Sequence, residues 1–240
     1  MRKKKRNPVR TSRPEREYQR ALTQVARQVG MIISGFPPGD PEAYPTIERI
    51  LRQYSDTLHD WAIATASRMI ADVNQQDRKA WVLRAQDMAK ALRDEILNAD
   101  TGVAMRGLLA EQVTLIKSLP LEAAKRVHEL TLKGIEDSTR ASEISQEILR
   151  SGEVSASRAM LIARTEVSRT AATLTEARAK AVGSEGYIWR TSHDGAVRES
   201  HKEMEGKFVP WSSPPTLDKL TGHAGCLPNC RCWPSPVIPE

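Results

Sequence analysis

Aromatic residues are scarce in this sequence: Phe, Trp and Tyr together make up 5 % of its 240 residues. Such a composition is typical of long helices that pack through Leu, Ile, Val and Ala. No apolar run approaches the roughly 20 residues that a membrane-spanning helix requires. No hydrophobic stretch follows the basic N-terminus, so a secretory signal is not expected. We therefore expect a soluble, folded protein that resides or is assembled inside a cell.

Cysteine is absent from the first 225 residues, and the three cysteines are Cys226, Cys230 and Cys232. An odd number of thiols in a reducing compartment favours free thiols or a metal site over a disulfide framework. The same C-terminal region holds three of the five histidines and three of the five tryptophans. A specific chemical function is therefore expected here.

Acidic residues are missing from the first 14 positions. Residues 1–20 carry nine Lys and Arg against two Glu, a net charge of +7, which leaves −1 for the other 220 residues. Pro8 and Pro14 discourage a helix, so residues 1–13 are predicted to be a basic flexible arm. Such an arm suits nucleic acid, bound through its phosphates, or an acidic protein surface; the alternative is a solvated tail. The candidate nucleic-acid-binding residues are Arg2, Lys3, Lys4, Lys5, Arg6 and Arg10.

Helical periodicity covers most of the chain from residue 14 to residue 182. Helices are predicted at 14–33, from Thr46 to about 70, from Asp77 to about 96, at 102–118, from Pro120 to 132, at about 138–150 and at 155–182. Residues 14–115 are assigned to a helical region and residues 116–240 to a second domain. The fold class is α+β and predominantly α, with long helices followed by a small α+β unit that contains the Cys and His residues.

The composition changes sharply after residue 182, because half of the fourteen prolines fall between Pro210 and Pro239. Short strands are predicted at 187–191 and 207–211, with a brief helix at 198–204 between them. Residues 232–238 are predicted to form an edge segment, because prolines alternate through it. This unit, residues 183–240, is small enough to need a staple or a supporting helix.

A metal site is the first interpretation of the Cys and His residues. Cys226, Cys230 and Cys232 place three thiols on one turn-rich loop, and His201 or His223 completes a tetrahedral zinc shell. The predicted ligands are Cys230, Cys232, His201 and Cys226, with His223 as the alternative, and the predicted cofactor is a structural zinc ion. No other cofactor is expected.

Two alternatives compete with the metal site. His201-Lys202-Glu203 with Cys226 and Cys230 imitates the zinc deaminase pattern. However, Gly225 stands where that pattern has proline, and the prolines that follow prevent the required helix. In the second alternative the cysteines are small buried residues, or two of them form a bond under oxidising conditions. His201 then donates to a backbone carbonyl and Asp194 pairs with Arg198.

An ordered series of residues resembles the Mu F-like family of phage minor head proteins, also called head morphogenesis proteins. The resemblance spans residues 116 to 236, about half of the chain. It comprises Ala163-Arg164-Thr165-Glu166, Trp189, Asp194, Val197, Arg198, His201, Gly206, Pro214-Pro215, Gly222 and Asn229-Cys230-Arg231-Cys232. Within it, Arg164, Glu166, Trp189, Asp194 and Arg198 are interpreted as structural motif residues.

The resemblance implies a virion component rather than an enzyme. Its expected partners are the phage portal protein and, further, packaged double-stranded DNA, scaffold or major capsid protein, with no membrane. Its expected location is inside the head near the portal vertex after assembly in the host cytoplasm, and its expected role is head assembly or DNA exit. The alternative function is a capsid-carried effector or nuclease-like zinc enzyme. A free DNA-binding protein is a third reading, but the sequence lacks a helix-turn-helix signal.

Overall fold

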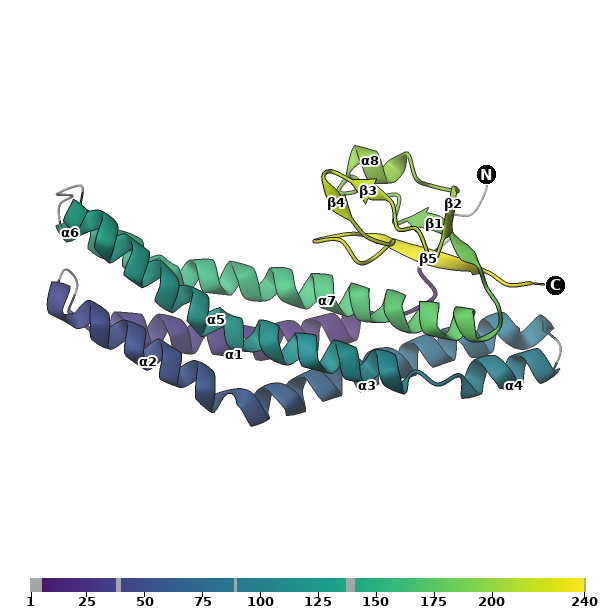
Figure 1. The fold of residues 1–240 in the computed structure, drawn as a ribbon, viewed down its shortest axis with the longest axis horizontal. Coiled ribbons are helices and arrows are strands. Elements are labelled where there is room, and N and C mark those ends of the chain that lie inside the picture. Colours follow the sequence, from purple (N-terminus) through teal and green to yellow (C-terminus); the bar gives the residue numbers. More distant parts are fainter. Residues whose placement is uncertain (1–5, 38–39, 89, 137–140, 240) are drawn as a thin grey trace. The chain divides into compact units, whose positions relative to one another are not determined.

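A computed structural model of the protein describes residues 6–37, 40–88, 90–136 and 141–239. Helices fill the chain up to residue 181 (Figure 1). The α-helices in this part are α1 Ser12–Ser34, α2 Tyr44–Thr57, α3 His59–Arg84, α4 Lys90–Asn98, α5 Gly102–Glu136, α6 Ala141–Leu149 and α7 Ser151–Ala181, and the 3-10 turns are η1 Pro41–Ala43 and η2 Ala85–Asp87. The predicted fold class is confirmed: predominantly helical, with a small antiparallel sheet near the C-terminus.

The C-terminal segment contains short strands and one short helix. Its elements are β1 Gly186–Thr191, α8 Glu199–Lys202, β2 Phe208–Pro210, β3 Thr216–Leu217, β4 Leu220–Thr221 and β5 Cys232–Val237. The strands β2, β1 and β5 form an antiparallel sheet in that order, and β3 pairs with β4 in a separate hairpin. The predicted strands and the helix between them are therefore confirmed.

The chain forms two compact units, whose boundaries cut through α1, α3, α5 and α7. Unit 1 comprises residues 1–15, 68–109 and 164–240, and unit 2 comprises residues 16–67 and 110–163. No helix in the described part of the chain is both long enough and apolar enough to cross a membrane.

Unit 2 is a helical body whose core comes from α1, α2, α5 and α6. This core contains Val29, Ile33, Tyr44, Ile47, Leu51, Ala123, Ala124, Val127, Ile144 and Ile148. Helices α1 and α7 approach each other closely at Gly30 and Gly152, since a Cβ atom at Gly152 would lie 3.1 Å from the Gly30 Cα. The absence of two side chains therefore sets how closely these helices pack.

Replacing Gly152 with valine is expected to lower the free energy of unfolding by about 1–3 kcal/mol, because the new side chain forces α7 away from α1. Gly107→Val is the matched control, since a Cβ at Gly107 meets nothing within 4 Å. It should change stability by less than about 0.5 kcal/mol. Urea unfolding followed by circular dichroism measures both, and equal effects would contradict the role of the close approach.

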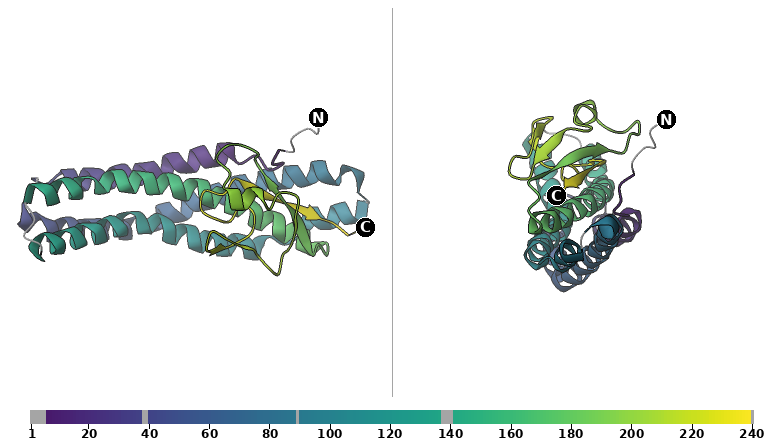
Figure 2. Two further views of the ribbon diagram at one scale, coloured as in Figure 1. Left: turned by 90° about the horizontal axis from the view of Figure 1, so that it is seen from above. Right: turned by 90° about the vertical axis from the view of Figure 1, so that its right-hand side faces the viewer.

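Unit 1 combines the small sheet with the C-terminal parts of α3 and α7, and β5 lies along α7 (Figures 1 and 2). Its core includes three of the five tryptophans, Trp81, Trp189 and Trp211. The helices are joined by a buried polar network. Asp77 on α3 accepts hydrogen bonds from Thr175 Oγ1 and Arg178 Nη1 on α7, each at 2.5 Å, and Arg178 also donates to Asn74 at 2.7 Å.

Asp77 was predicted to begin a helix, and this prediction is wrong. It lies inside α3, where its carboxylate is fully buried and binds α7 rather than capping a helix. The helix predicted from Thr46 to about 70 is also divided. At Leu58 the backbone N–H bonds to the Ser55 carbonyl, three residues back, so that α2 ends and α3 begins.

Pro120 was predicted to open a new helix, but α5 continues through it. Proline removes one backbone donor and therefore one helical hydrogen bond. On both sides of it, Ile116, Leu119, Ala123 and Ala124 are buried in unit 2. Their packing holds the backbone helical and outweighs the lost bond.

The predicted edge segment is confirmed as β5, an outer strand of the three-stranded sheet. Trp189 exchanges its backbone hydrogen bonds with Gly206 and Lys207, on the β2 side of the sheet. Pro234 and Pro236, which stand opposite Trp189 and Tyr187, are therefore at positions of β5 that face away from β1. The outward carbonyl of Pro236 accepts a hydrogen bond of 2.6 Å from Arg84.

Candidate metal centre

Three buried side chains with metal-binding atoms meet in unit 1. His201 lies on the short helix α8, Cys230 precedes β5, and Cys232 begins it. The Nδ1 atom of His201 lies 3.5 Å from the sulfur of Cys230 and 3.5 Å from the sulfur of Cys232. All three donor atoms lie within 4.8 Å of one another, so this group has the chemistry and the spacing to bind a metal ion.

The imidazole of His201 is oriented by its surroundings. It is 1 % exposed and meets the indole of Trp189 edge to face, with ring centroids 5.6 Å apart. Its Nε2 atom is buried and has no hydrogen-bond partner among the described residues. Nδ1 is therefore the nitrogen that a metal ion between the two sulfurs would reach.

The two thiols share a hydrogen bond that favours the thiolate form of Cys230. The pKa of Cys230 is lowered to about 5, chiefly because Cys232 donates a hydrogen bond to its sulfur, with a further contribution from backbone donors. The pKa of Cys232 is raised by the same hydrogen bond and by burial. A thiolate is the form that binds metals.

The loop that carries Cys230 is tied to α7. The backbone N–H of Asn229 donates to Thr165 Oγ1 at 3.1 Å, and that of Gly225 donates to the Cys230 sulfur at 3.4 Å. Gly225 has φ +89°, and a Cβ there would lie 3.3 Å from the Cβ of Ala172 on α7. A glycine is therefore required at this point for the loop to approach the helix.

The structure does not bring the other two predicted ligands into the group, which among the described residues comprises His201, Cys230 and Cys232. Burial raises the pKa of Cys226 to about 12, which disfavours its thiolate. His223 contacts the Tyr187 hydroxyl through Nδ1 at 3.2 Å, and burial lowers its pKa. The His223 ring instead meets the rings of Tyr187 and Trp211 edge to face.

Comparison with known proteins bears on the segment that contains this group. Residues 125–234 match the model of the family described as Phage Mu protein F like protein. This segment of the chain is therefore similar to the Mu F-like family. A Haemophilus influenzae protein described as an uncharacterized protein is 34 % identical over 134 residues. The match covers 56 % of this chain and 29 % of that protein. No solved structure matches the chain.

The residues interpreted as structural motif residues differ from one another in burial and in their partners. Trp189 is fully buried in β1. Glu166 on α7 is buried and lies 3.6 Å from Arg169. Arg164 is exposed, and its Nε atom lies 3.5 Å from a carboxylate oxygen of Glu15.

The pairing of Asp194 with Arg198, expected if the cysteines were only packing residues, is wrong. Asp194 binds Arg231 Nε at 3.0 Å. Arg198 donates instead to the Pro228 carbonyl at 3.1 Å and lies 3.7 Å from Asp218. The loop from β1 to α8 directs these two side chains to different parts of the Cys230 loop. The expectation that His201 donates to a carbonyl also fails, since its Nδ1 faces the sulfurs.

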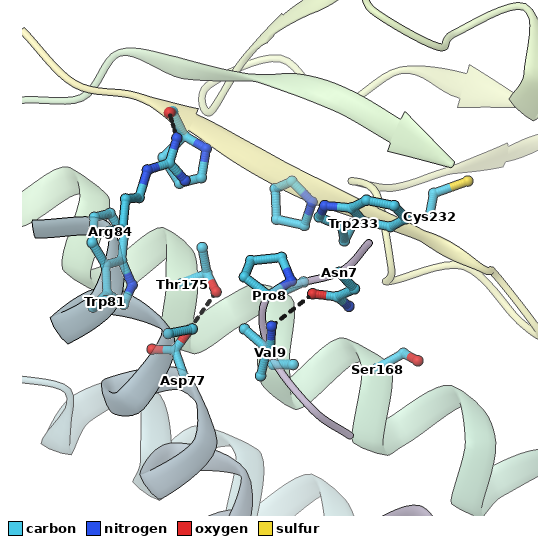
Figure 3. A pocket seen from close by; sticks show the side chains of 15 residues that line it. Asn7, Pro8, Val9, Asp77, Trp81, Arg84, Ser168, Thr175, Cys232 and Trp233 are labelled. Atoms are coloured by element: carbon cyan, nitrogen blue, oxygen red, sulfur yellow. Dashed lines mark hydrogen bonds between the residues drawn. The ribbon is translucent and has the colours of Figure 1, made fainter. Parts of the chain in front are cut away.

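The basic arm lies partly within the described residues. Arg2, Lys3, Lys4 and Lys5 lie outside them, whereas Arg6 and Arg10 are described and exposed. Between these two arginines the chain passes between α3, α7 and β5 (Figure 3). Val9 is buried there, and its N–H donates to Asn7 Oδ1 at 3.0 Å. The sequence did not predict that Val9 is buried, because its burial depends on contacts with residues more than 60 positions away.

Proposed function

We propose that the chain is a minor structural protein of a tailed-phage head, located inside the head at the portal vertex and bound to the portal protein. The observation that supports this proposal is the Mu F-like match over residues 125–234, together with the ordered motif residues within it. In this proposal the protein acts in head assembly or DNA exit, its basic N-terminus contacts packaged DNA, and no catalytic step is assigned to it.

The head assignment predicts that the protein is found in purified particles in few copies and is retained by the portal protein of the same phage. Co-expression with tagged portal protein, followed by affinity purification, tests the contact, and mass spectrometry of particles tests the location. Particles from a phage with this gene disrupted provide the background. A protein absent from particles and not retained by portal would contradict the proposal.

The DNA contact predicts a salt-dependent interaction through the N-terminal cations. Because Val9 is buried, the sharpest variant replaces only Arg2, Lys3, Lys4 and Lys5 with glutamine and keeps the anchor. If all four contact phosphates, the slope of log K against log salt should fall by about 3–4. Fluorescence anisotropy with labelled duplex DNA measures this slope. Unchanged affinity at low salt would exclude the contact, while retention by portal should be the same for both proteins.

We propose further that the His201, Cys230 and Cys232 group binds a structural zinc ion. Zinc–sulfur and zinc–nitrogen bonds of about 2.3 and 2.0 Å in a tetrahedron place the sulfur and nitrogen about 3.5 Å apart, which matches both Nδ1–Sγ distances. The donors are of the types that zinc prefers. Such an ion supplies the staple that a small α+β unit needs.

Elemental analysis of protein purified without chelators is expected to find about one zinc per chain. His201→Ala and Cys230→Ser should lower this content to near zero. Cys226→Ser is the matched control, because its sulfur lies outside the group, and should retain the zinc. A zinc-free parent protein would contradict the site, and loss of zinc from the control would add Cys226 to its ligands.

A further inference from the structure

An open groove of about 850 Å³ lies beside the metal centre in unit 1. Its walls come from three separate parts of the sequence: the N-terminal segment, α7, and the loops that flank β1 and β5. Each part contributes one arginine, namely Arg6, Arg164 and Arg231. Three guanidinium groups that are distant in the sequence therefore meet at one concave surface.

Two of these arginines are held in place in a way that leaves their outer nitrogens available. Arg164 faces Glu15 through Nε at 3.5 Å, and Arg231 faces Asp194 through Nε at 3.0 Å. A guanidinium has five N–H donors. For both side chains, the contact recorded among the described residues uses the Nε edge. The two terminal nitrogens of each guanidinium, which match a phosphate in two-point contact, have no partner within the described part of the chain.

The carboxylate that orients Arg231 is itself fixed. Asp194 accepts hydrogen bonds from the Ser192 hydroxyl and the Ala196 N–H, each at 3.0 Å. A guanidinium held on an anchored carboxylate loses less side-chain entropy when it binds a ligand. The two carboxylates therefore orient Arg164 and Arg231, and the groove has three arginines against these two carboxylates.

We propose that this groove binds the phosphodiester backbone of nucleic acid, with Arg164 and Arg231 each contacting a phosphate. The arrangement favours a polyanion over a single anion, because Arg6 is preceded directly by four further cations, Arg2 to Lys5, with no acid among them. These cations add charge for further phosphates next to Arg6 in the sequence. Ser168, Thr11 and Asn7 add the neutral donors that commonly accompany arginine at phosphates. The inference rests on the proposed DNA contact and locates it on the folded domain.

The test is the salt dependence of duplex DNA binding by the full chain carrying Arg164→Gln and Arg231→Gln. Each lost phosphate contact lowers the slope of log K against log salt by about 0.9, so the double variant should lose about 1.8. The matched control is Arg52→Gln with Arg150→Gln, which removes the same charge from two exposed arginines of unit 2. Each of those arginines is also paired with one glutamate, and their slope should be unchanged.

The inference is overturned if the slope of log K against log salt falls equally in both double variants, or if it falls in neither. Titration with inorganic pyrophosphate alone distinguishes a small anion from nucleic acid as the source of the phosphate. If the groove variant loses pyrophosphate binding but keeps DNA binding, the groove is a small-anion site and the proposal is overturned. If the glutamine double does not fold, the Arg164→Lys and Arg231→Lys double replaces it. It keeps the charge but loses the forks, so affinity should fall at least several-fold with the slope retained, and unchanged affinity overturns the proposal.

The DNA contact of the arm and that of the groove can be tested separately. If the Arg2 to Lys5 glutamine variant loses DNA affinity while the groove variant does not, the arm contact stands and the groove inference falls. If neither loses affinity, the proposed DNA contact falls as well. Retention by the portal protein is measured independently of both.

Discussion

Asp77→Ala is expected to lower the free energy of unfolding by about 3–5 kcal/mol, because it leaves the buried guanidinium of Arg178 without its counter-charge. Asp77 is fully buried and Arg178 is 3 % exposed. Burial raises the pKa of Asp77 despite its hydrogen bonds to Thr175 and Arg178. Asp77 and Arg178 join α3 to α7 beneath the sheet, so their loss should loosen unit 1.

The same reasoning predicts that an apolar pair is tolerated. Asp77→Leu combined with Arg178→Met removes both charges and keeps most of the volume, so it should recover most of the loss seen in Asp77→Ala. Lys180→Ala serves as the control on α7, because Lys180 is exposed and pairs with the partly buried Glu176. Its removal should cost less than about 1 kcal/mol. Urea unfolding compares the four proteins. If Asp77→Ala lowers the free energy of unfolding only slightly, the importance of the buried pair is contradicted.

Trp189→Ala is expected to have an effect of similar size, a loss of about 3–5 kcal/mol, because it removes a large, fully buried side chain. The indole lies 6.3 Å from the Tyr187 ring and 5.6 Å from the His201 ring, centroid to centroid. The cavity would therefore open beside the metal-binding group. We expect weaker retention of zinc during dialysis against a chelator as well as lower stability.

Phe208→Ala is the control for Trp189→Ala, since Phe208 lies on the neighbouring strand β2 and is 50 % exposed. Its removal should cost less than about 1 kcal/mol and leave zinc retention unchanged. A Trp189→Ala protein as stable as the parent would show that the core of unit 1 does not depend on this side chain. Thermal unfolding and zinc analysis on the same samples provide both readouts.

Local sequence signals predicted β1, α8, β2 and β5, but not the hairpin of β3 and β4. The prolines after residue 210 excluded a helix, and the alternation of proline with other residues predicted β5 as an edge strand, which the sheet order confirms. The series from Arg164 to Cys232 pointed to the Mu F-like family, which the match over residues 125–234 confirms. In each case the information lay in residue types at short spacing.

The predictions that failed depended on partners far away in the sequence. Asp77 has the residue type of a helix cap, and only its contact with Arg178, 101 positions later, explains its place inside α3. Pro120 has the residue type of a helix start, but the packing of α5 within unit 2 decides the outcome. Asp194 and Arg198 stand at a pairing distance in the sequence, yet the turn between them directs Asp194 to Arg231.

For the candidate site, the sequence named the right kind of group but could not select its members. Five Cys and His residues were candidates, and the structure brings together His201, Cys230 and Cys232. The turn that includes Gly225 aims the chain so that Cys226 and His223 lie elsewhere. The groove was not foreseen, because its arginines come from positions 6, 164 and 231 and only the fold places them on one surface.

The outer edge of β5 has a consequence for how copies of this protein can associate. Exposed sheet edges recruit strands from other molecules, and this hazard grows with protein concentration. Here Pro234 and Pro236 remove backbone donors from the outward side of β5, while Arg84 occupies the outward carbonyl of Pro236. An incoming strand would find neither the donors nor that acceptor. Copies crowded together should therefore resist growing into fibres through this sheet, which leaves contacts between side chains as the route to ordered assembly.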